Sequence, residues 1–91
     1  MITLLQSSVD TDVSLPVALS HRGGDDLRVQ VDFAVGATGT VRVYGRISSD
    51  LKWVLLNTVT TDTLLLVEYV EYVRATLTGS AGGVVTVGVA V

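Results

Sequence analysis

Cysteine is absent from this 91-residue chain, and histidine, proline, tryptophan and phenylalanine occur once each. Without cysteine the chain cannot form disulfides or a thiolate zinc site. A single histidine, His21, leaves most metal-binding and acid–base chemistry without its usual side chain. Charged residues make up only 16% of the sequence and hydrophobic residues 48%, which is too apolar and too weakly charged for a disordered chain.

Long apolar runs and basic clusters are also lacking. The longest aliphatic runs, such as residues 64–67, are far shorter than the ~20 residues that span a bilayer, and the first residues do not form a signal peptide. Six Lys and Arg against nine Asp and Glu give a net charge of −3, with no basic stripe for a phosphate backbone. The expected partners therefore include neither a membrane nor a nucleic acid.

Alternation of apolar and polar residues dominates what is present. Residues 27–35 and 40–47 both follow a period of two, which is typical of β-strands, and a glycine-rich loop separates them. This pattern predicts a hairpin. The expected cross-strand pairs are Phe33 with Val41, Val31 with Val43 and Leu27 with Ile47 on the inner face, and Asp32 with Arg42 and Gln30 with Tyr44 on the outer face.

The C-terminal part repeats the pattern. Residues 73–78 alternate, a five-residue loop follows at 79–83, and a valine-rich segment closes the chain at 84–91. A second hairpin is predicted here, because a one-residue slip would expose every valine. Its expected pairs are Leu77 with Val85, Ala75 with Val87, Val73 with Val89 and Thr76 with Thr86.

The remaining segments complete an all-β pattern. A turn at 48–50 leads into a strand around 53–58, and a further strand covers 63–67. Residues 64–75 also fit a three-turn helix, but their valines and tyrosines favour extended structure. Residues 13–20 fit an edge strand, since the proline there cannot donate a hydrogen bond to a neighbour.

Seven or eight short strands with turns every 8–12 residues predict a single-domain antiparallel β-sandwich over residues 1–91, of jelly-roll or immunoglobulin-like type. Residues 1–15 form either an N-terminal arm that orders on binding or an edge strand of this sandwich. The high apolar content of so small a chain further indicates that some apolar surface is buried between subunits.

No constellation of residues predicts catalysis. His21 has no serine in a G-x-S-x-G turn to activate, and Glu68 and Glu71 would point to opposite faces of a strand. The sequence therefore predicts no enzyme, no catalytic residue, no cofactor and no metal ligand. Whether the loop aspartates at 10–12 and 25–26 bind calcium stays open, although no EF-hand pattern is present.

Two groups of side chains are candidates for contacts. The aromatic residues Trp53, Tyr44, Tyr69 and Tyr72 form either a stacking platform for sugars or anchors in a core or interface. The arginines Arg28, Arg42 and Arg46, predicted to share the outer face of the first hairpin, form either a solvated face or an electrostatic contact with an acidic neighbour.

The order of these pieces resembles a known group of proteins. GRISSD at residues 45–50 precedes KWVL at 52–55; a threonine-rich stretch, YVRATLTG at 72–79 and a glycine-rich connection to VVTV at 84–87 follow. Across residues 26–91 this is similar to the small β-sandwich virion proteins of tailed bacteriophages, such as capsid decoration (cement) proteins, head fibres and tail accessory modules. The resemblance lies in strand and turn order.

The resemblance implies a non-enzymatic, symmetric and often trimeric building block that binds the surface of a virion assembled in the host cytoplasm. Its implied partners are further copies of the chain and the major capsid protein or another virion protein. The alternatives are a tail or neck accessory protein and, in another class, a carbohydrate-binding module. The interface candidates are Trp53, Val54, Leu56, Tyr69, Tyr72, Arg28, Arg42 and Arg46.

The position of Trp53 separates these functions. Burial in the core or an interface favours the structural role, whereas exposure beside Tyr44 or Tyr72 favours sugar binding.

Overall fold

Nine β-strands and no helix are present in the residues that the structure, a computed structural model, describes: 2–8, 11–13, 17–18, 26–68 and 70–90. The strands are β1 (Ile2–Ser7), β2 (Thr11–Val13), β3 (Val17–Ala18), β4 (Asp26–Phe33), β5 (Thr38–Arg46), β6 (Val54–Val59), β7 (Thr63–Glu68), β8 (Tyr72–Ala81) and β9 (Val85–Ala90). Residues 64–75 are therefore extended rather than helical, as predicted. Within these ranges no helix is long and apolar enough to cross a membrane.

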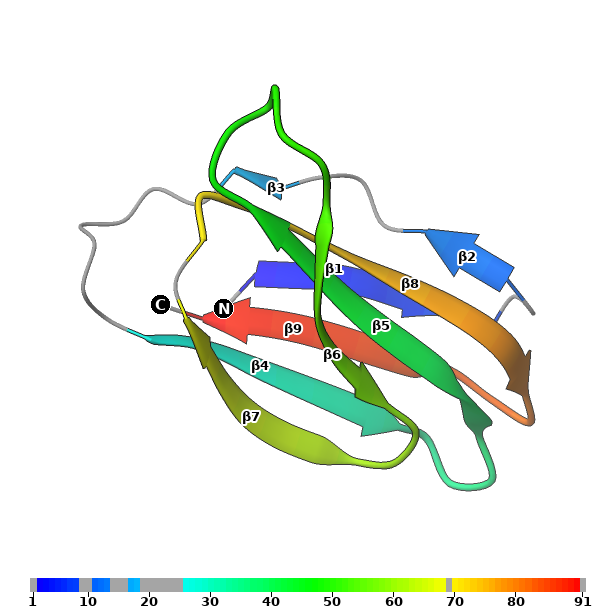
Figure 1. The fold of residues 1–91 in the computed structure, drawn as a ribbon. Coiled ribbons are helices and arrows are strands. Elements are labelled where there is room, and N and C mark those ends of the chain that lie inside the picture. Colours follow the sequence, from blue (N-terminus) through cyan, green and yellow to red (C-terminus); the bar gives the residue numbers. More distant parts are fainter. Residues whose placement is uncertain (1, 9–10, 14–16, 19–25, 69, 91) are drawn as a thin grey trace.

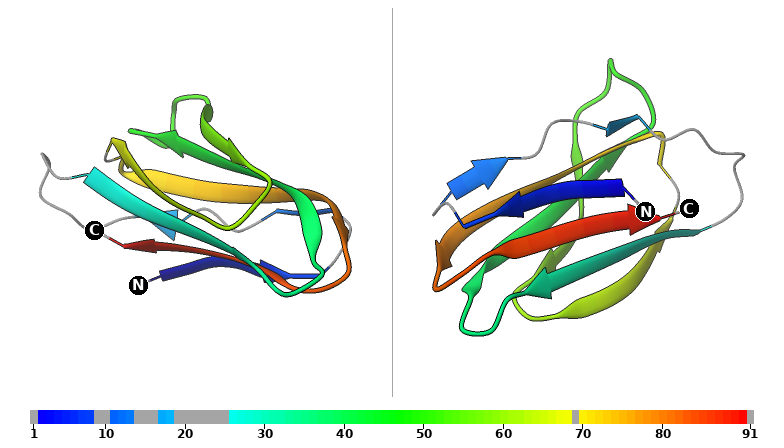
Figure 2. Two further views of the ribbon diagram at one scale, coloured as in Figure 1. Left: turned by 90° about the horizontal axis from the view of Figure 1, so that it is seen from below. Right: turned by 180° about the vertical axis from the view of Figure 1, so that it is seen from behind.

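The strands form two antiparallel sheets that pack face to face (Figures 1 and 2). One sheet has the order β1-β9-β4-β7, and the other has the order β2-β8-β5-β6, with β3 also paired to β8. Because β2 and β3 pair with successive parts of β8, they share one strand position. The eight positions then pair first with last, second with seventh, third with sixth and fourth with fifth. This connectivity defines a jelly roll and confirms the predicted β-sandwich.

Both predicted hairpins are wrong in their pairing. β4 and β5 lie in opposite sheets, so Val31 pairs with Val87 and not with Val43. β8 and β9 are likewise separated, so Leu77 pairs with Val41 and not with Val85. The inward faces were nevertheless predicted correctly, except at the ends of the two alternating segments, where Val35 and Ile47 are exposed. Alternation determines which face a side chain takes, but it is equally compatible with either partner strand.

Two short connections cross between the sheets where hairpins were predicted. Residues 34–37 and 82–84 each carry the chain from one sheet to the other, and they lie side by side at one end of the sandwich, where the amide of Ala34 donates to the carbonyl oxygen of Val84 at 3.0 Å. Gly82 has a φ of 81°, and a Cβ there would collide with the carbonyl group of Gly36. Glycine is needed at this position for close backbone approach between two loops.

Among the described residues, the fully buried core between the sheets consists of Leu, Val and Ala side chains from strands of both sheets, with Phe33 packed partly buried against it. Ten of them are buried below 2% exposure: Leu27, Leu77, Val29, Val31, Val41, Val43, Val73, Val85, Val87 and Val89. Aromatic side chains are absent from this set, so Trp53 does not anchor the core.

Residues 2–7 of the N-terminal segment lie in an edge strand. β1 pairs with β9 at the edge of the four-stranded sheet. The consecutive residues Leu4 and Leu5 are both buried, which a regular strand does not allow, and the register shift between Thr3 and Leu5 accounts for it. β3 and the last residue of β2 fall within residues 13–20, where an edge strand was predicted, and both strands pair with β8 at the edge of the five-stranded sheet; the proline itself lies outside the described residues.

Cysteine cross-links distinguish the jelly roll from the hairpin arrangement. Asp32 pairs with Thr86 on adjacent strands, and Cα atoms of such antiparallel partners are about 4.5–5.5 Å apart, within the range that a disulfide bridges. We expect the Asp32→Cys/Thr86→Cys variant to form an intramolecular disulfide under mild oxidation, as measured by intact mass and non-reducing gel mobility. The control, Asp32→Cys/Arg42→Cys, should stay reduced as a monomer. A disulfide in the control alone would contradict the topology.

Candidate functional site

Two arginines and three aromatic residues gather on the outer face of the five-stranded sheet. Register pairs Tyr44 with Arg74 and Arg46 with Tyr72 across β5 and β8, so arginine and tyrosine alternate in both directions. Trp53, which directly precedes β6, completes the group. We call these five half-buried residues the arginine–aromatic cluster.

Contacts within the cluster are cation–π interactions. The Cζ atom of Arg46 lies 4.1 Å from the ring centroid of Trp53, and that of Arg74 lies 4.9 Å from the same ring. Arg46 also lies 5.6 Å from the ring of Tyr72, and Arg74 lies 5.5 Å from the ring of Tyr44. Each such contact stabilises by about 0.5–1 kcal/mol at exposed sites and more when water is excluded. One indole ring therefore lies beside two cations.

The two guanidinium groups make few hydrogen bonds within the described part of the chain. Arg46 donates from Nη1 to the carbonyl oxygen of Leu51 at 3.3 Å, whereas the Nε atoms of both Arg46 and Arg74 are buried without an acceptor. Among the described residues, no carboxylate pairs with either arginine. Buried unsatisfied donors are uncommon and call for an explanation.

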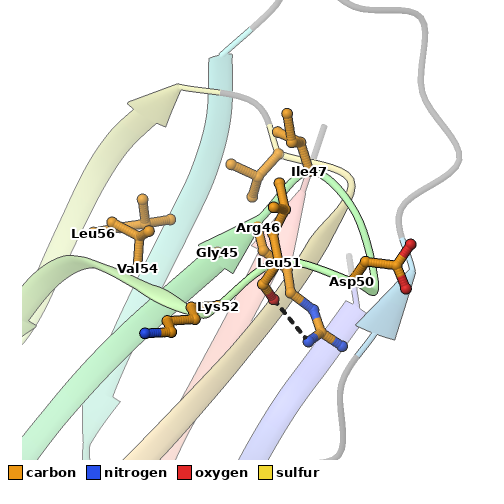
Figure 3. Close-up of a pocket in the computed structure, with 9 residues that line it drawn as sticks. Gly45, Arg46, Ile47, Asp50, Leu51, Lys52, Val54 and Leu56 are labelled. Carbon is orange, nitrogen blue, oxygen red and sulfur yellow. Dashed lines mark hydrogen bonds between the residues drawn. The ribbon is translucent and has the colours of Figure 1, made fainter.

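A pocket adjoins the cluster at the loop between β5 and β6 (Figure 3). Its volume is about 680 Å³, within the ~300–1,000 Å³ typical of ligand-sized clefts. Its wall is mostly apolar, and Arg46, Asp50 and Lys52 supply its charged groups. We call it the loop pocket; its lining residues are Gly45, Arg46, Ile47, Asp50, Leu51, Lys52, Val54, Leu56 and Val70.

The absence of a side chain at Gly45 allows Val70 and Leu56 to pack closely beside the loop pocket. A Cβ atom at this position would lie 2.7 Å from Cγ2 of Val70 and 2.9 Å from Cδ1 of Leu56. Both side chains therefore pack directly over the backbone of β5. The register shift in β6 next to this site lets Leu56 reach the core while Leu55 faces solvent.

Exposed leucines and a valine lie on the edge strands β6 and β7. A short connection, residues 60–62, joins these two strands. Leu64 and Leu66 on β7 are 71% and 63% exposed, and Val54 on β6 is 61% exposed. β6 carries no charged residue, and β7 carries only Glu68, at its end. We call Val54, Leu55, Leu64 and Leu66 the apolar edge. Leu64 and Leu66 alternate with residues paired to buried Val29 and Leu27, so they face outward from the four-stranded sheet, whereas Leu55, paired with Tyr44, faces outward from the five-stranded sheet.

The structure brings together only some of the predicted interface residues. Trp53, Tyr72 and Arg46 belong to the cluster. Arg42 is on the same sheet face, where its Nη1 donates to Oγ1 of Thr78 at 3.2 Å, and Val54 and Leu56 line the loop pocket. The predicted cluster of three arginines is wrong, because Arg28 is in β4 on the other sheet.

Arg74 is the residue that the sequence prediction missed. Its alternation with buried Val73 and Ala75 indicates an outward side chain, but the wrong pairing of β8 with β9 kept it apart from Tyr44, its actual partner on β5. Trp53 fits neither predicted position fully: its ring is half-buried outside the core and contacts Arg46 and Arg74, which in turn lie over the rings of Tyr72 and Tyr44.

Several predicted sites cannot be compared with the structure. Tyr69, His21 and the aspartates at 10 and 25 lie outside the described residues. Within the described part of the chain, no group of three or more His, Asp or Glu side chains is placed to hold a metal ion.

Comparison with protein-family models, curated proteins and solved structures gives no significant match to this chain. The functional argument therefore depends on the cluster, the pocket and the apolar edge.

Filling the position of Gly45 tests the packing beneath the loop pocket. We expect Gly45→Ala to lower the free energy of unfolding by about 1–3 kcal/mol, because the new methyl group overpacks against Val70 and Leu56. Urea unfolding of Gly45→Ala, Val70→Ala and the double variant measures the coupling between the two positions. The double variant should be more stable than additivity predicts, whereas exposed Thr58→Ala should change stability by less than about 0.5 kcal/mol. Strict additivity would contradict the contact.

Proposed function

We propose that the protein is a structural subunit of a bacteriophage virion, acting as a capsid decoration (cement) protein that binds the assembled head and stabilises it. The proposal combines the resemblance in strand and turn order over residues 26–91 with a jelly-roll fold, which is common among viral capsid proteins. A tail or neck accessory role would use the same surfaces and is the related alternative.

The apolar edge is the observation that carries this proposal. Edge strands present unpaired backbone groups, and soluble proteins usually protect them with lysine, proline or cover from another element. Here β6 and β7 instead present Val54, Leu55, Leu64 and Leu66 to solvent. A chain that functions within an assembly has a use for such a surface, because a second copy or a capsid subunit covers it.

Decoration proteins act by adding contacts. A homotrimer, the state that we propose, presents three copies of each contact surface where capsomers meet. Linked weak contacts then give a stable attachment, because the second and third binding events are intramolecular. Since the subunits bind the assembled head in preference to free capsid proteins, mass action stabilises the head.

A carbohydrate-binding module is the second candidate, and the arginine–aromatic cluster favours it, since lectins also use jelly rolls. Three aromatic residues on one face suggest sugar binding, but the contacts that their rings make weaken this interpretation. Guanidinium groups lie over the rings of Trp53, Tyr44 and Tyr72, so these ring faces are not simply free for sugar stacking. The structural role is therefore preferred.

Charged substitutions on β7 test self-association. We expect the wild-type chain to have the mass of a trimer in size-exclusion chromatography with light scattering. Leu64→Lys/Leu66→Lys should raise the dissociation constant about hundredfold or more, because two leucines that the proposed subunit interface covers become charged. Both side chains are exposed in the chain itself, so its melting temperature should stay within a few degrees. Val35→Lys, a matched change at a fully exposed valine, should leave the mass unchanged. A monomeric wild type would contradict the trimer.

Particle binding tests the decoration role directly. We expect the purified chain to co-sediment with heads of the phage that encodes it and to be visible on them by electron microscopy at regular lattice positions. Heads lacking the chain should release DNA at a lower temperature, and adding it back should restore the difference. Binding to tails alone would support the accessory role, and binding to neither would contradict a virion function.

A further inference from the structure

We propose that the arginine–aromatic cluster is a binding site for the carboxylates of an extended acidic polypeptide segment, with Arg46 and Arg74 as the residues that bind them. The identity of the segment as part of a neighbouring virion protein rests on the proposed function. The binding chemistry does not, and isolated peptides test it separately.

The two arginines form a built cationic site with unused donors. Each guanidinium group carries five N–H donors, yet among the described residues the pair makes one hydrogen bond, from Arg46 to the carbonyl oxygen of Leu51. That bond and the contacts with Trp53 and the tyrosines hold the groups in fixed positions. Two like charges beside one ring, with no carboxylate partner in the described part of the chain, favour an anion from outside.

Carboxylate is the anion that fits this chain best. A guanidinium group matches it with two parallel hydrogen bonds. A nucleic acid is disfavoured, because the chain has a net charge of −3 and only six Lys and Arg. A neutral sugar would need the ring faces that the guanidinium groups already cover.

Geometry indicates the spacing of the carboxylates. Both guanidinium carbons lie close to one ring centroid, at 4.1 and 4.9 Å, so their separation cannot exceed the sum of these distances. In an extended peptide, side chains two residues apart share a face and are about 7 Å apart. Acidic residues at alternate positions can therefore engage both arginines together, whereas adjacent acidic residues point to opposite faces.

Fluorescence of Trp53 provides the measurement, because it is the only tryptophan of the chain. The probes are two synthetic octapeptides of equal composition, one with glutamate alternating with threonine and one with glutamates in adjacent pairs separated by two threonines. We expect the alternating peptide to change the emission and to bind about tenfold tighter than the paired one. Arg46→Gln and Arg74→Gln should each weaken its binding about tenfold or more.

Matched variants separate this site from general charge attraction. Arg28→Gln removes the same charge from the opposite sheet and should leave the affinity within twofold. Arg74→Lys keeps the charge but loses the planar donors, so its binding should also weaken. Circular dichroism confirms that each variant is folded.

The proposal would be overturned by equal binding of both peptides, by an equal loss in Arg28→Gln, or by tighter binding of oligogalacturonate, a neutral oligosaccharide or single-stranded DNA. Peptide binding without particle binding would retain the site and refute only the virion role. If the Arg46→Gln/Arg74→Gln variant still binds particles and the wild-type chain binds no peptide, the carboxylate site is refuted and the virion role is retained.

Discussion

Contact between two aliphatic sheet faces is the constraint on which the rest of the molecule depends. Its largest members, Leu27 and Leu77, come from opposite sheets and are completely buried. Burying a side chain of this kind stabilises by roughly 1.5–3 kcal/mol, and no other source of comparable size is visible within the described residues. Because Val, Leu and Ala fill the interior, arginine and tryptophan are left for the outer faces. The surface chemistry follows from this division.

The sequence pattern predicted which face of the sheet each side chain takes far better than it predicted which strands pair with each other. Val31 and Val43 both point inward as predicted, because period-two alternation acts within a strand. Their neighbours, Val87 and Ala75, depend on how distant segments meet. The glycines at 36 and 82 indicate a reversal of the chain, and such a signal is the same whether the chain returns in one sheet or crosses to the other. The pairing of β4 with β9 and of β5 with β8 shows that the chain crosses, and the two loops pack against each other where it does so.

The same limit explains which parts of the candidate site were predictable. Outward positions for Arg42, Arg46 and Arg74 follow from alternation alone. Their grouping follows from the pairing of β5 with β8, which sets Tyr44 beside Arg74 and removes Arg28 to the other sheet. Trp53 adds a further condition, since it precedes β6 and reaches the cluster through the loop after β5. No local pattern in the sequence indicates that the loop places Trp53 beside the two arginines.

The β6 part of the apolar edge is a neighbour of the arginine–aromatic cluster, and their physical roles differ. Leu55 pairs with Tyr44 across β6 and β5, so the exposed leucine is next to the cluster on the same sheet. Apolar contact supplies affinity in proportion to the area buried but is weakly directional. Charged groups contribute less net free energy, yet they fix register and exclude wrong partners. Under the proposed function, a subunit that attaches at one lattice position needs both, and arginines held rigid by aromatic rings provide direction at low entropic cost.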